Sequence, residues 1–391
     1  MINAKYQLIF LGDESSFIGE IRAAFEKHLY ELGLDLGKVE FVVEENFKSA
    51  YASNNPAFCL FFGDSIGSLK NLSELTHLKN DATIILPVVK NLQEFKKFVP
   101  EILWPVNGYQ LAESNDVEPL VSCILEGLGL LRLSRRLFIS YKRDESSSVA
   151  IQLFERFEKA GFDVFLDTHS IRPGETFQEE LWHRLADTDI VVLLNTKGFL
   201  KSEWTTHELA QANSMSIGIM QLIWPNNIPE RAAEISLPYK LVENDFGNNH
   251  FTDARSFLND GSLDEIVNKA ESLRARSLAA RQDNIVTEFI KSADKFGIDI
   301  TLQPEKFLTM KNTKGEELVI IPTVGVPQAF TYNQSEELVK RIKLKKTAAI
   351  YLLFDHRNIR EKWLEHLAWL DTYLPIKTIK LIERQAWLEK I

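Results

Sequence analysis

An indole and a carboxylate lie four residues apart in the segment 202–208, which reads SEWTTHE. If a helix begins as early as Ser202, then Trp204 and Glu208 lie on one face of it. A carboxylate can stabilise positive charge that develops in a reaction, and an indole can stack on a planar ring. The pair is therefore a candidate site. Plainer interpretations stay open: Trp204 as a core or interface residue, and Glu208 as a solvated carboxylate on a helix.

Polar and cationic side chains lie at the end of the strand that segment 137–141 (LFISY) predicts, and directly after it. They belong to Ser140, Tyr141, Lys142 and Arg143. An open α/β sheet binds its ligands in a crevice at the carboxyl ends of its strands. These four residues are therefore expected beside such a crevice.

A second predicted strand, residues 163–166, is followed directly by Asp167. The loop behind it, residues 168–175, contains Pro173 and Gly174, which shape the backbone, and Arg172, whose side chain can project over the crevice. Asp167 is equally suited to cap this loop. The loop is a second candidate for contact with a ligand.

Three segments resemble the Toll/interleukin-1 receptor (TIR) domain in their order and separation. They read FISYKRDES from residue 138, FLDTHSIRPGETF from residue 165 and FLKSEWTTHELAQA from residue 199. One such segment would be a weak signal, because strands of the FxSY kind are common, but the ordered set is specific. The resemblance covers roughly residues 135–260, within a predicted domain of residues 132–265, and says nothing about either flank.

The resemblance implies a flavodoxin-like parallel sheet and one of two functions. Some TIR domains are signalling scaffolds, whereas others cleave NAD+ at the nicotinamide–ribose bond. In the cleaving members the catalytic residue is a glutamate in a W-x-x-x-E helix, the position of Glu208, which favours an enzyme that releases nicotinamide and ADP-ribose or a cyclic isomer. Arg172 or Lys142 would pair with the diphosphate. The resemblance implies substrate contacts for Ser140, Tyr141, Lys142, Arg143, Asp167, Ile171, Arg172, Gly174, Ser202 and Trp204.

The implied reaction needs NAD+ as substrate and no other cofactor. Nicotinamide in NAD+ already carries a positive charge and leaves as a neutral base, so no strong general acid is needed. One carboxylate facing an oxocarbenium-like ribose, an aromatic surface and a closed pocket would suffice. His169, His183 and His207 have no HxxxH or HExxH spacing, and we expect no metal.

The resemblance also implies a homo-oligomer. Family members commonly build the site between two copies of the domain, so TIR–TIR contacts are the expected switch, with the flanking domains binding an unidentified trigger. By analogy, the protein would be a prokaryotic effector that depletes NAD+ during phage infection. A non-enzymatic adaptor is the main alternative, and base exchange of the nucleoside deoxyribosyltransferase kind is another.

The composition is that of a folded protein. The chain has 391 residues, of which 45% are hydrophobic and 26% charged, and its net charge of -10 makes nucleic-acid binding unexpected. Cys59 and Cys123 lie in apolar stretches and are interpreted as core thiols in a reducing compartment. Because no apolar run approaches the roughly 18 residues of a membrane span, we expect a cytoplasmic protein that does not contact membranes.

Two further domains are predicted around the central one, both for sensing or assembly. The first, residues 1–131, is an α/β domain of the flavodoxin-like kind, with apolar runs at 6–11, 39–43, 58–62 and 83–89 typical of buried parallel strands and helical patterns at 17–32 and 117–131. The other, residues 275–391, is an α/β or α+β domain. Its predicted elements are helices at 283–296, 335–344 and 359–370, a β-rich segment at 298–324 and a strand at 348–354.

Overall fold

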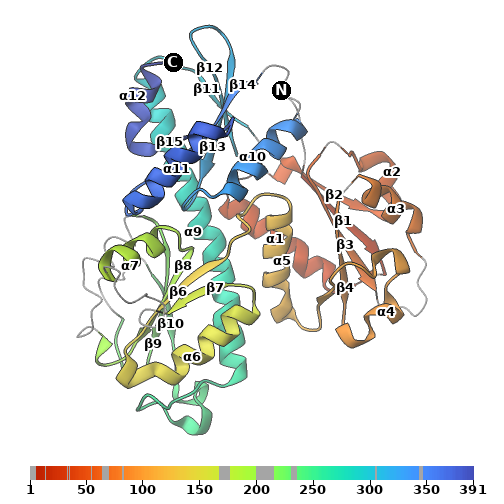
Figure 1. The fold of residues 1–391 in the computed structure, drawn as a ribbon. Helices are drawn as coiled ribbons and strands as arrows, with labels where there is room; N and C mark the ends of the chain where they lie inside the picture. Colours follow the sequence, from red (N-terminus) through yellow and green to blue (C-terminus); the bar gives the residue numbers. More distant parts are fainter. Residues whose placement is uncertain are drawn as a thin grey trace. The chain divides into compact units, whose positions relative to one another are not determined.

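The computed structural model divides the chain into two compact units, residues 1–133 and 134–391, and each is described by itself (Figure 1). The structure describes residues 6–13, 15–32, 34, 36–53, 55–63, 70–81, 83–166, 177–199, 215–229, 236–303, 306–342 and 347–391.

The first unit is an open parallel sheet with the strand order β2-β1-β3-β4-β5. Its strands are β1 (Tyr6–Gly12), β2 (Val39–Val43), β3 (Ala57–Gly63), β4 (Ile84–Val89) and β5 (Tyr109–Gln110). Its helices are α1 (Ile18–Glu31), α2 (Phe47–Ala50), α3 (Leu72–Asn80), α4 (Phe95–Phe98) and α5 (Val117–Gly127). Strands β1 and β3 are buried along almost their whole length, which explains their continuous apolar sequences. This order is that of flavodoxin-like folds and confirms the predicted fold class.

The second unit begins with another five-stranded parallel sheet, in the order β10-β9-β8-β6-β7. Its strands are β6 (Arg136–Ser140), β7 (Asp163–Leu166), β8 (Ile190–Asn195), β9 (Gly218–Ile223) and β10 (Leu237–Lys240). Helix α6 (Arg143–Lys159) joins β6 to β7, and α7 (Phe177–Ala186) precedes β8. The connectivity is again flavodoxin-like, as predicted. The helix expected to carry Trp204 and Glu208 lies outside the described residues.

Helix α9 (Asp260–Asp294) is a single helix of 35 residues, and the helix predicted at 283–296 is its last part. It begins at Asn259, whose side chain accepts a hydrogen bond from the Ser262 amide at 2.8 Å. Residues 262–294 contain no glycine or proline, so nothing in that sequence interrupts the helix.

A mixed sheet in the order β11-β12-β13-β14-β15 follows α9. Its strands are β11 (Ile300–Leu302), β12 (Leu308–Lys311), β13 (Glu317–Thr323), β14 (Thr347–Phe354) and β15 (Lys377–Lys380). The first three are antiparallel, whereas β13, β14 and β15 are parallel and are linked by α10 (Ala329–Ile342) and α11 (Glu361–Tyr373). Helix α12 (Arg384–Leu388) ends the fold.

The two sheets of residues 134–391 share one apolar core. Phe138 and Leu193 of the first sheet belong to the same buried cluster as Leu352 and Phe354 of β14 and Leu367 of α11. Helix α9 contributes to both of the remaining cores: it gives Leu263, Ile266, Val267 and Ala270 to the first sheet and Ile285, Val286, Phe289 and Ala293 to the second. The expected boundary between residues 265 and 275 therefore falls inside a helix that serves both sheets.

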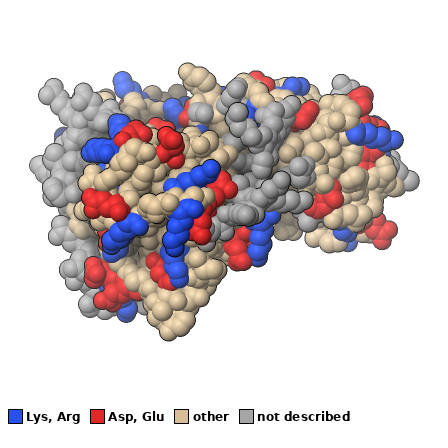
Figure 2. Space-filling model, turned by 90° about the horizontal axis from the view of Figure 1, so that it is seen from above, with Lys and Arg blue, Asp and Glu red and all other residues tan. Residues whose placement is uncertain are grey.

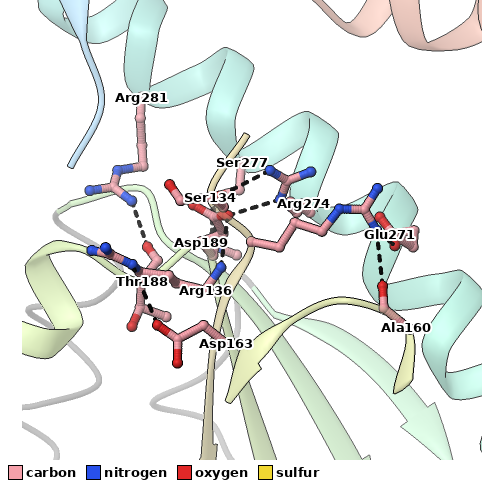
Figure 3. Close-up of polar contacts among 12 residues, drawn as sticks. Ser134, Arg136, Ala160, Asp163, Thr188, Asp189, Glu271, Arg274, Ser277 and Arg281 are labelled. Atoms are coloured by element: carbon pink, nitrogen blue, oxygen red, sulfur yellow. Dashed lines mark hydrogen bonds and ion pairs between the residues drawn. The ribbon is translucent and has the colours of Figure 1, made fainter. Parts of the chain in front are cut away.

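Buried arginines fasten α9 to the amino ends of β6 and β8 (Figure 3). The Arg274 Nε donates to Asp189 Oδ2 at 2.8 Å, and Arg135 Nη1 donates to Glu271 Oε1 at 2.6 Å. Arg281 donates from its two terminal nitrogens to the carbonyls of Thr188 and Ala186, each at 2.7 Å. Such buried charges are stable only when their partners stay in place, so this edge of the sheet is held in a fixed geometry.

Candidate active site

Strand β6 delivers Ser140 to the carboxyl edge of its sheet, as the sequence predicts. Ser140 is fully buried, and its Oγ has no hydrogen-bond partner in the part of the chain that the structure describes. Tyr141, the next residue, is also buried. A buried hydroxyl without a partner is rare in folded proteins, and a ligand or a water molecule commonly supplies the missing bond.

Lys142 and Arg143 lie where β6 turns into α6. Lys142 has extended backbone angles and caps the helix, and Arg143 is its first residue. The helix is bent at Ser146, whose φ of -148° and ψ of 21° are not helical. The regular helix therefore starts beyond Ser146.

Lys142 and Glu145 form an ion pair at the start of α6, beside the carboxyl edge of the sheet; this pair is called the rim of the candidate site. The Lys142 Nζ donates to Glu145 Oε1 at 2.5 Å, and the Gly198 amide donates to Glu145 Oε2 at 2.8 Å. Burial alone would raise the pKa of Glu145, but the hydrogen bonds from Lys142 and from the Gly198 amide, with the charge of Lys142, outweigh it and hold that pKa below its ordinary value. A Cβ at position 198 would lie 2.1 Å from Glu145 Oε1, so glycine is what permits this approach.

Glu145 is a residue that sequence reasoning did not select. The available signal was its place three residues after Lys142, which puts the two side chains on neighbouring turns of the helix start.

Side-chain amides connect the carboxyl ends of β8 and β9. Asn195 Nδ2 donates to Gln221 Oε1 at 2.9 Å, and Asn227 Nδ2 donates to Asn195 Oδ1 at 2.8 Å. Beside them, the Trp224 side chain is buried, and its Nε1 has no hydrogen-bond partner among the described residues. Three such polar atoms, on Ser140, Thr196 and Trp224, thus lie at the carboxyl edge of one sheet, where a polar ligand could provide partners.

The rest of the predicted set falls on residues that the structure does not describe. This applies to Asp167, Ile171, Arg172, Gly174, Ser202, Trp204 and Glu208. Their approach to Ser140 and Lys142 stays a prediction.

The described residues contain no group of three or more His, Cys, Asp and Glu side chains arranged to hold a metal ion. Both cysteines are free thiols, and burial raises the pKa of Cys59 far above its usual value. Lys and Arg lie interspersed with Asp and Glu on the face shown in Figure 2. That face has the mixed charge of an ordinary protein surface.

None of the described helices has the length and apolar character needed to cross a membrane.

Comparison with known proteins identifies the part of the chain that carries this edge. Residues 137–255 match the TIR domain family. The chain is also 29% identical over 113 residues to a protein of Brachypodium distachyon described as a "Probable 2′ cyclic ADP-D-ribose synthase". That alignment covers 27% of this chain and 50% of the relative, so the chain spans about half the length of the relative that it matches. Together with the parallel sheet of order β10-β9-β8-β6-β7, these matches show that residues 137–255 of this protein are a TIR domain.

Proposed function

We propose that this protein cleaves NAD+ at the nicotinamide–ribose bond. The observation that carries the proposal is the TIR domain at residues 137–255 together with its similarity to a protein named as a synthase of 2′ cyclic ADP-D-ribose. Formation of a cyclic ADP-ribose requires an electrophilic anomeric carbon, and departure of nicotinamide from NAD+ supplies one. NAD+ cleavage is therefore the step that a hydrolase and a cyclase of this kind would share.

In this proposal the Glu208 carboxylate faces the ribose. The bond from C1′ to the nicotinamide nitrogen breaks, its electron pair stays with nicotinamide, and the carboxylate stabilises the oxocarbenium-like sugar. Water then adds to C1′ and gives up a proton, or a ribose hydroxyl of the same molecule adds in its place. The first route gives ADP-ribose and the second a cyclic isomer.

The other residues of the proposed site bind and orient the substrate. Ser140 and Trp224 have buried polar atoms without described partners, which suits them to hydrogen bonds with a sugar or an amide. Lys142 is already paired with Glu145 at 2.5 Å, so its binding to a diphosphate requires an exchange of partners. Arg172 would meet the diphosphate directly.

Assembly would control the activity, because an unregulated enzyme would drain an essential cofactor. We propose that TIR–TIR contacts between copies complete the site and that the flanking parts of the chain bind the trigger. A role in prokaryotic antiphage defence, in the cytoplasm, is part of the same proposal and rests on analogy.

Nicotinamide release by the purified full-length chain tests the proposal. The protein is incubated with NAD+ with and without a crowding agent that promotes assembly, and nicotinamide, ADP-ribose and cyclic products are separated by chromatography. Glu208→Gln should lower the rate by roughly 10²-fold or more, the usual effect of losing one transition-state contact. Glu203→Gln, in the same segment, is the matched control and should keep the wild-type rate.

The outcomes separate the alternatives. Full activity in Glu208→Gln would remove this residue from the mechanism. If the assembled wild-type chain releases no nicotinamide from NAD+, the non-enzymatic adaptor becomes the favoured function. A new nucleoside formed from an added free base would indicate base exchange.

A further inference from the structure

Four aromatic rings form a continuous row on the solvent side of α11. They belong to Trp363, His366, Trp369 and Tyr373, and each ring contacts the next, with centroids 5.8, 5.9 and 5.2 Å apart. We call these four side chains the aromatic stripe. Trp363 is 40% exposed, Trp369 56% and Tyr373 70%.

The stripe is unusual for a helix that already has a buried side. The leucines on the opposite side of α11 pack into the apolar core, so α11 has apolar side chains on both sides. The solvent side of such a helix is ordinarily polar. Exposed tryptophan and tyrosine side chains that lie together are typical of a surface that binds a partner.

The area of the stripe favours a short ligand over a second copy of the chain. Its tryptophans and tyrosine together expose roughly 250–400 Å², since a fully buried aromatic residue contributes roughly 150–250 Å². A stable protein–protein interface needs about 800 Å² from each partner. A short linear peptide can bind to the smaller area.

The polar atoms of the stripe are mainly hydrogen-bond donors. The indole N–H groups of Trp363 and Trp369 and the Tyr373 hydroxyl have no hydrogen-bond partner in the described part of the chain. The stripe therefore suits a ligand that is rich in acceptors. Nucleic acid is such a ligand, but the exposed charges of α11 are two glutamates and one lysine, which do not attract a polyanion.

The ring planes leave two open corners along the stripe. The planes of Trp363 and His366 are inclined by 88°, and those of Trp369 and Tyr373 by 56°. The midpoints of the two pairs lie about 10 Å apart along the helix axis, at roughly 1.5 Å per residue. A polyproline II helix repeats every three residues, or about 9.3 Å. Two prolines at positions i and i+3 of a peptide would therefore reach both corners.

We propose that the aromatic stripe binds a proline-rich peptide in the polyproline II conformation, with prolines three residues apart in the two corners. The carbonyl groups of such a peptide have no internal hydrogen bonds, so they can accept from the indole and phenol donors. The peptide conformation is largely preformed, so little ordering entropy opposes binding to a small surface. Glu365, which is exposed and lies one turn before Trp369, would pair with a cationic residue between the prolines.

One end of the stripe lies beside the TIR domain. The His183 imidazole of α7 stacks on the Trp363 indole, with centroids 5.5 Å apart and planes inclined by 15°. These two residues also line a cavity of about 400 Å³, together with Arg184 and Arg360 among others. The end of a bound peptide would therefore lie next to the TIR domain.

Fluorescence anisotropy of a labelled peptide, PPRPPRPPR, with the full-length chain tests the proposal. We expect saturable binding that weakens about tenfold or more in Trp369→Ala and in Tyr373→Ala, because each variant loses one ring of a corner. Both side chains are more than half exposed, so these variants should fold normally. Tyr30→Ala, at an exposed tyrosine of α1, is the matched control and should bind the peptide as the wild type does.

Two comparisons separate the contribution of the prolines from that of charge. The peptide AARAARAAR keeps the cations without the prolines and should bind about tenfold more weakly or worse. Glu365→Gln should weaken the binding of PPRPPRPPR but leave that of PPQPPQPPQ unchanged, because only the first peptide has a cation to pair with the carboxylate.

The other possible occupants give different results. Absence of PPRPPRPPR binding, or binding that Trp369→Ala leaves unchanged, would overturn the proposal. If sedimentation shows self-association that Trp369→Ala abolishes, and no proline peptide binds, the stripe belongs to an interface between copies. If cellohexaose binds with this dependence on Trp369 and the peptide does not, the ligand is a glycan.

Peptide binding does not rest on the proposed function. If the chain binds PPRPPRPPR with this pattern of variants but releases no nicotinamide, the peptide site stands and the NAD+-cleaving function falls. If nicotinamide is released and no proline peptide binds, the peptide site falls and the enzyme stands.

Discussion

The Arg274 guanidinium and the Asp189 carboxylate form an ion pair of 2.8 Å in which neither side chain is exposed to solvent. Arg274 comes from the middle of α9, and Asp189 directly precedes β8. Arg274 also donates to the Ser134 carbonyl at 3.2 Å, where the second unit begins. One guanidinium thus links α9 to the start of β8, through Asp189, and to the first residue of the second unit, through Ser134.

Loss of one partner of this pair should destabilise the protein strongly. In Arg274→Met the Asp189 carboxylate stays buried without its partner, and we expect the free energy of unfolding to fall by about 3–5 kcal/mol. Denaturant unfolding followed by tryptophan fluorescence measures it, since six of the seven tryptophans lie after residue 133.

An exposed ion pair provides the comparison. Lys340 and Glu336 lie 2.8 Å apart on α10 with side chains that are 71% and 42% exposed, and Lys340→Gln should cost less than about 1 kcal/mol. Equal effects of the two substitutions would show that burial does not set the strength of the Arg274–Asp189 pair.

A proline on the solvent side of α9 should separate the two sheets that this helix joins. Ala280 is exposed near the middle of the helix, so its replacement removes little packing. Ala280→Pro should cost about 3 kcal/mol or more and split the calorimetric unfolding of residues 134–391 into two transitions. Ala280→Gly, the control, should cost about 1 kcal/mol and keep a single transition. One transition in the proline variant would mean that the shared core suffices to couple the sheets.

A methyl group at position 198 should disturb the rim of the candidate active site without unfolding it. The Cβ of Gly198→Ala would lie 2.1 Å from Glu145 Oε1 and 2.2 Å from Lys142 Nζ, both of which end flexible side chains. These atoms should move aside, so we expect a stability change below about 1 kcal/mol together with a lower rate of nicotinamide release.

Gly19→Ala is the matched control, because Gly19 lies in α1 and a Cβ there would meet nothing within 4 Å. It should leave the rate unchanged. An unaltered rate in Gly198→Ala would show that the Lys142–Glu145 pair has no part in the site.

Stability at acid pH should depend on Glu145. Its pKa is lowered in the folded state, so the carboxylate stabilises the fold above its ordinary pKa of 4.5, and this contribution disappears as the pH falls through the lowered folded value. Glu145→Gln lacks the contribution at every pH. Its unfolding midpoint should therefore fall less than that of the wild type between pH 6 and 3.

Glu158→Gln removes a carboxylate from the exposed side of the same helix and serves as the control. A parallel loss of stability in Glu145→Gln and the wild type would contradict the assigned contacts of Glu145.

The local sequence was enough to predict the strands of the parallel sheets. It was not enough to predict which residues from distant parts of the chain line a common cavity. The apolar runs at residues 6–11 and 58–62 predicted buried strands, because a strand covered on both faces needs apolar residues at every position, and the structure has these strands at Tyr6–Gly12 and Ala57–Gly63. The motif around Ser140 located the carboxyl edge of the TIR sheet for the same reason: a strand and the turn after it are local structures. Arg184 and Arg360 gave no such signal, since 175 intervening residues separate two side chains that line one cavity only because of tertiary packing.

Only the last part of helix α9 was predicted, for a related reason. Its outward side is charged along most of its length, and the side that packs changes from the TIR sheet at Ile266 to the second sheet at Ile285. One apolar stripe is therefore replaced by another partway along the helix, and no single amphipathic pattern extends over its whole length.

The segment that matches the TIR family, residues 137–255, is shorter than the segment needed to cover its apolar core. The family match ends at residue 255, yet Leu263, Ile266, Val267 and Ala270 close one side of that domain's interior, and Leu352, Phe354 and Leu367 close the other. A gene fragment that ended at residue 255 would encode a domain whose apolar surfaces, buried in the full chain, are exposed to solvent. Shuffling this domain between proteins in evolution would thus require carrying the long helix, and everything it holds, along with it.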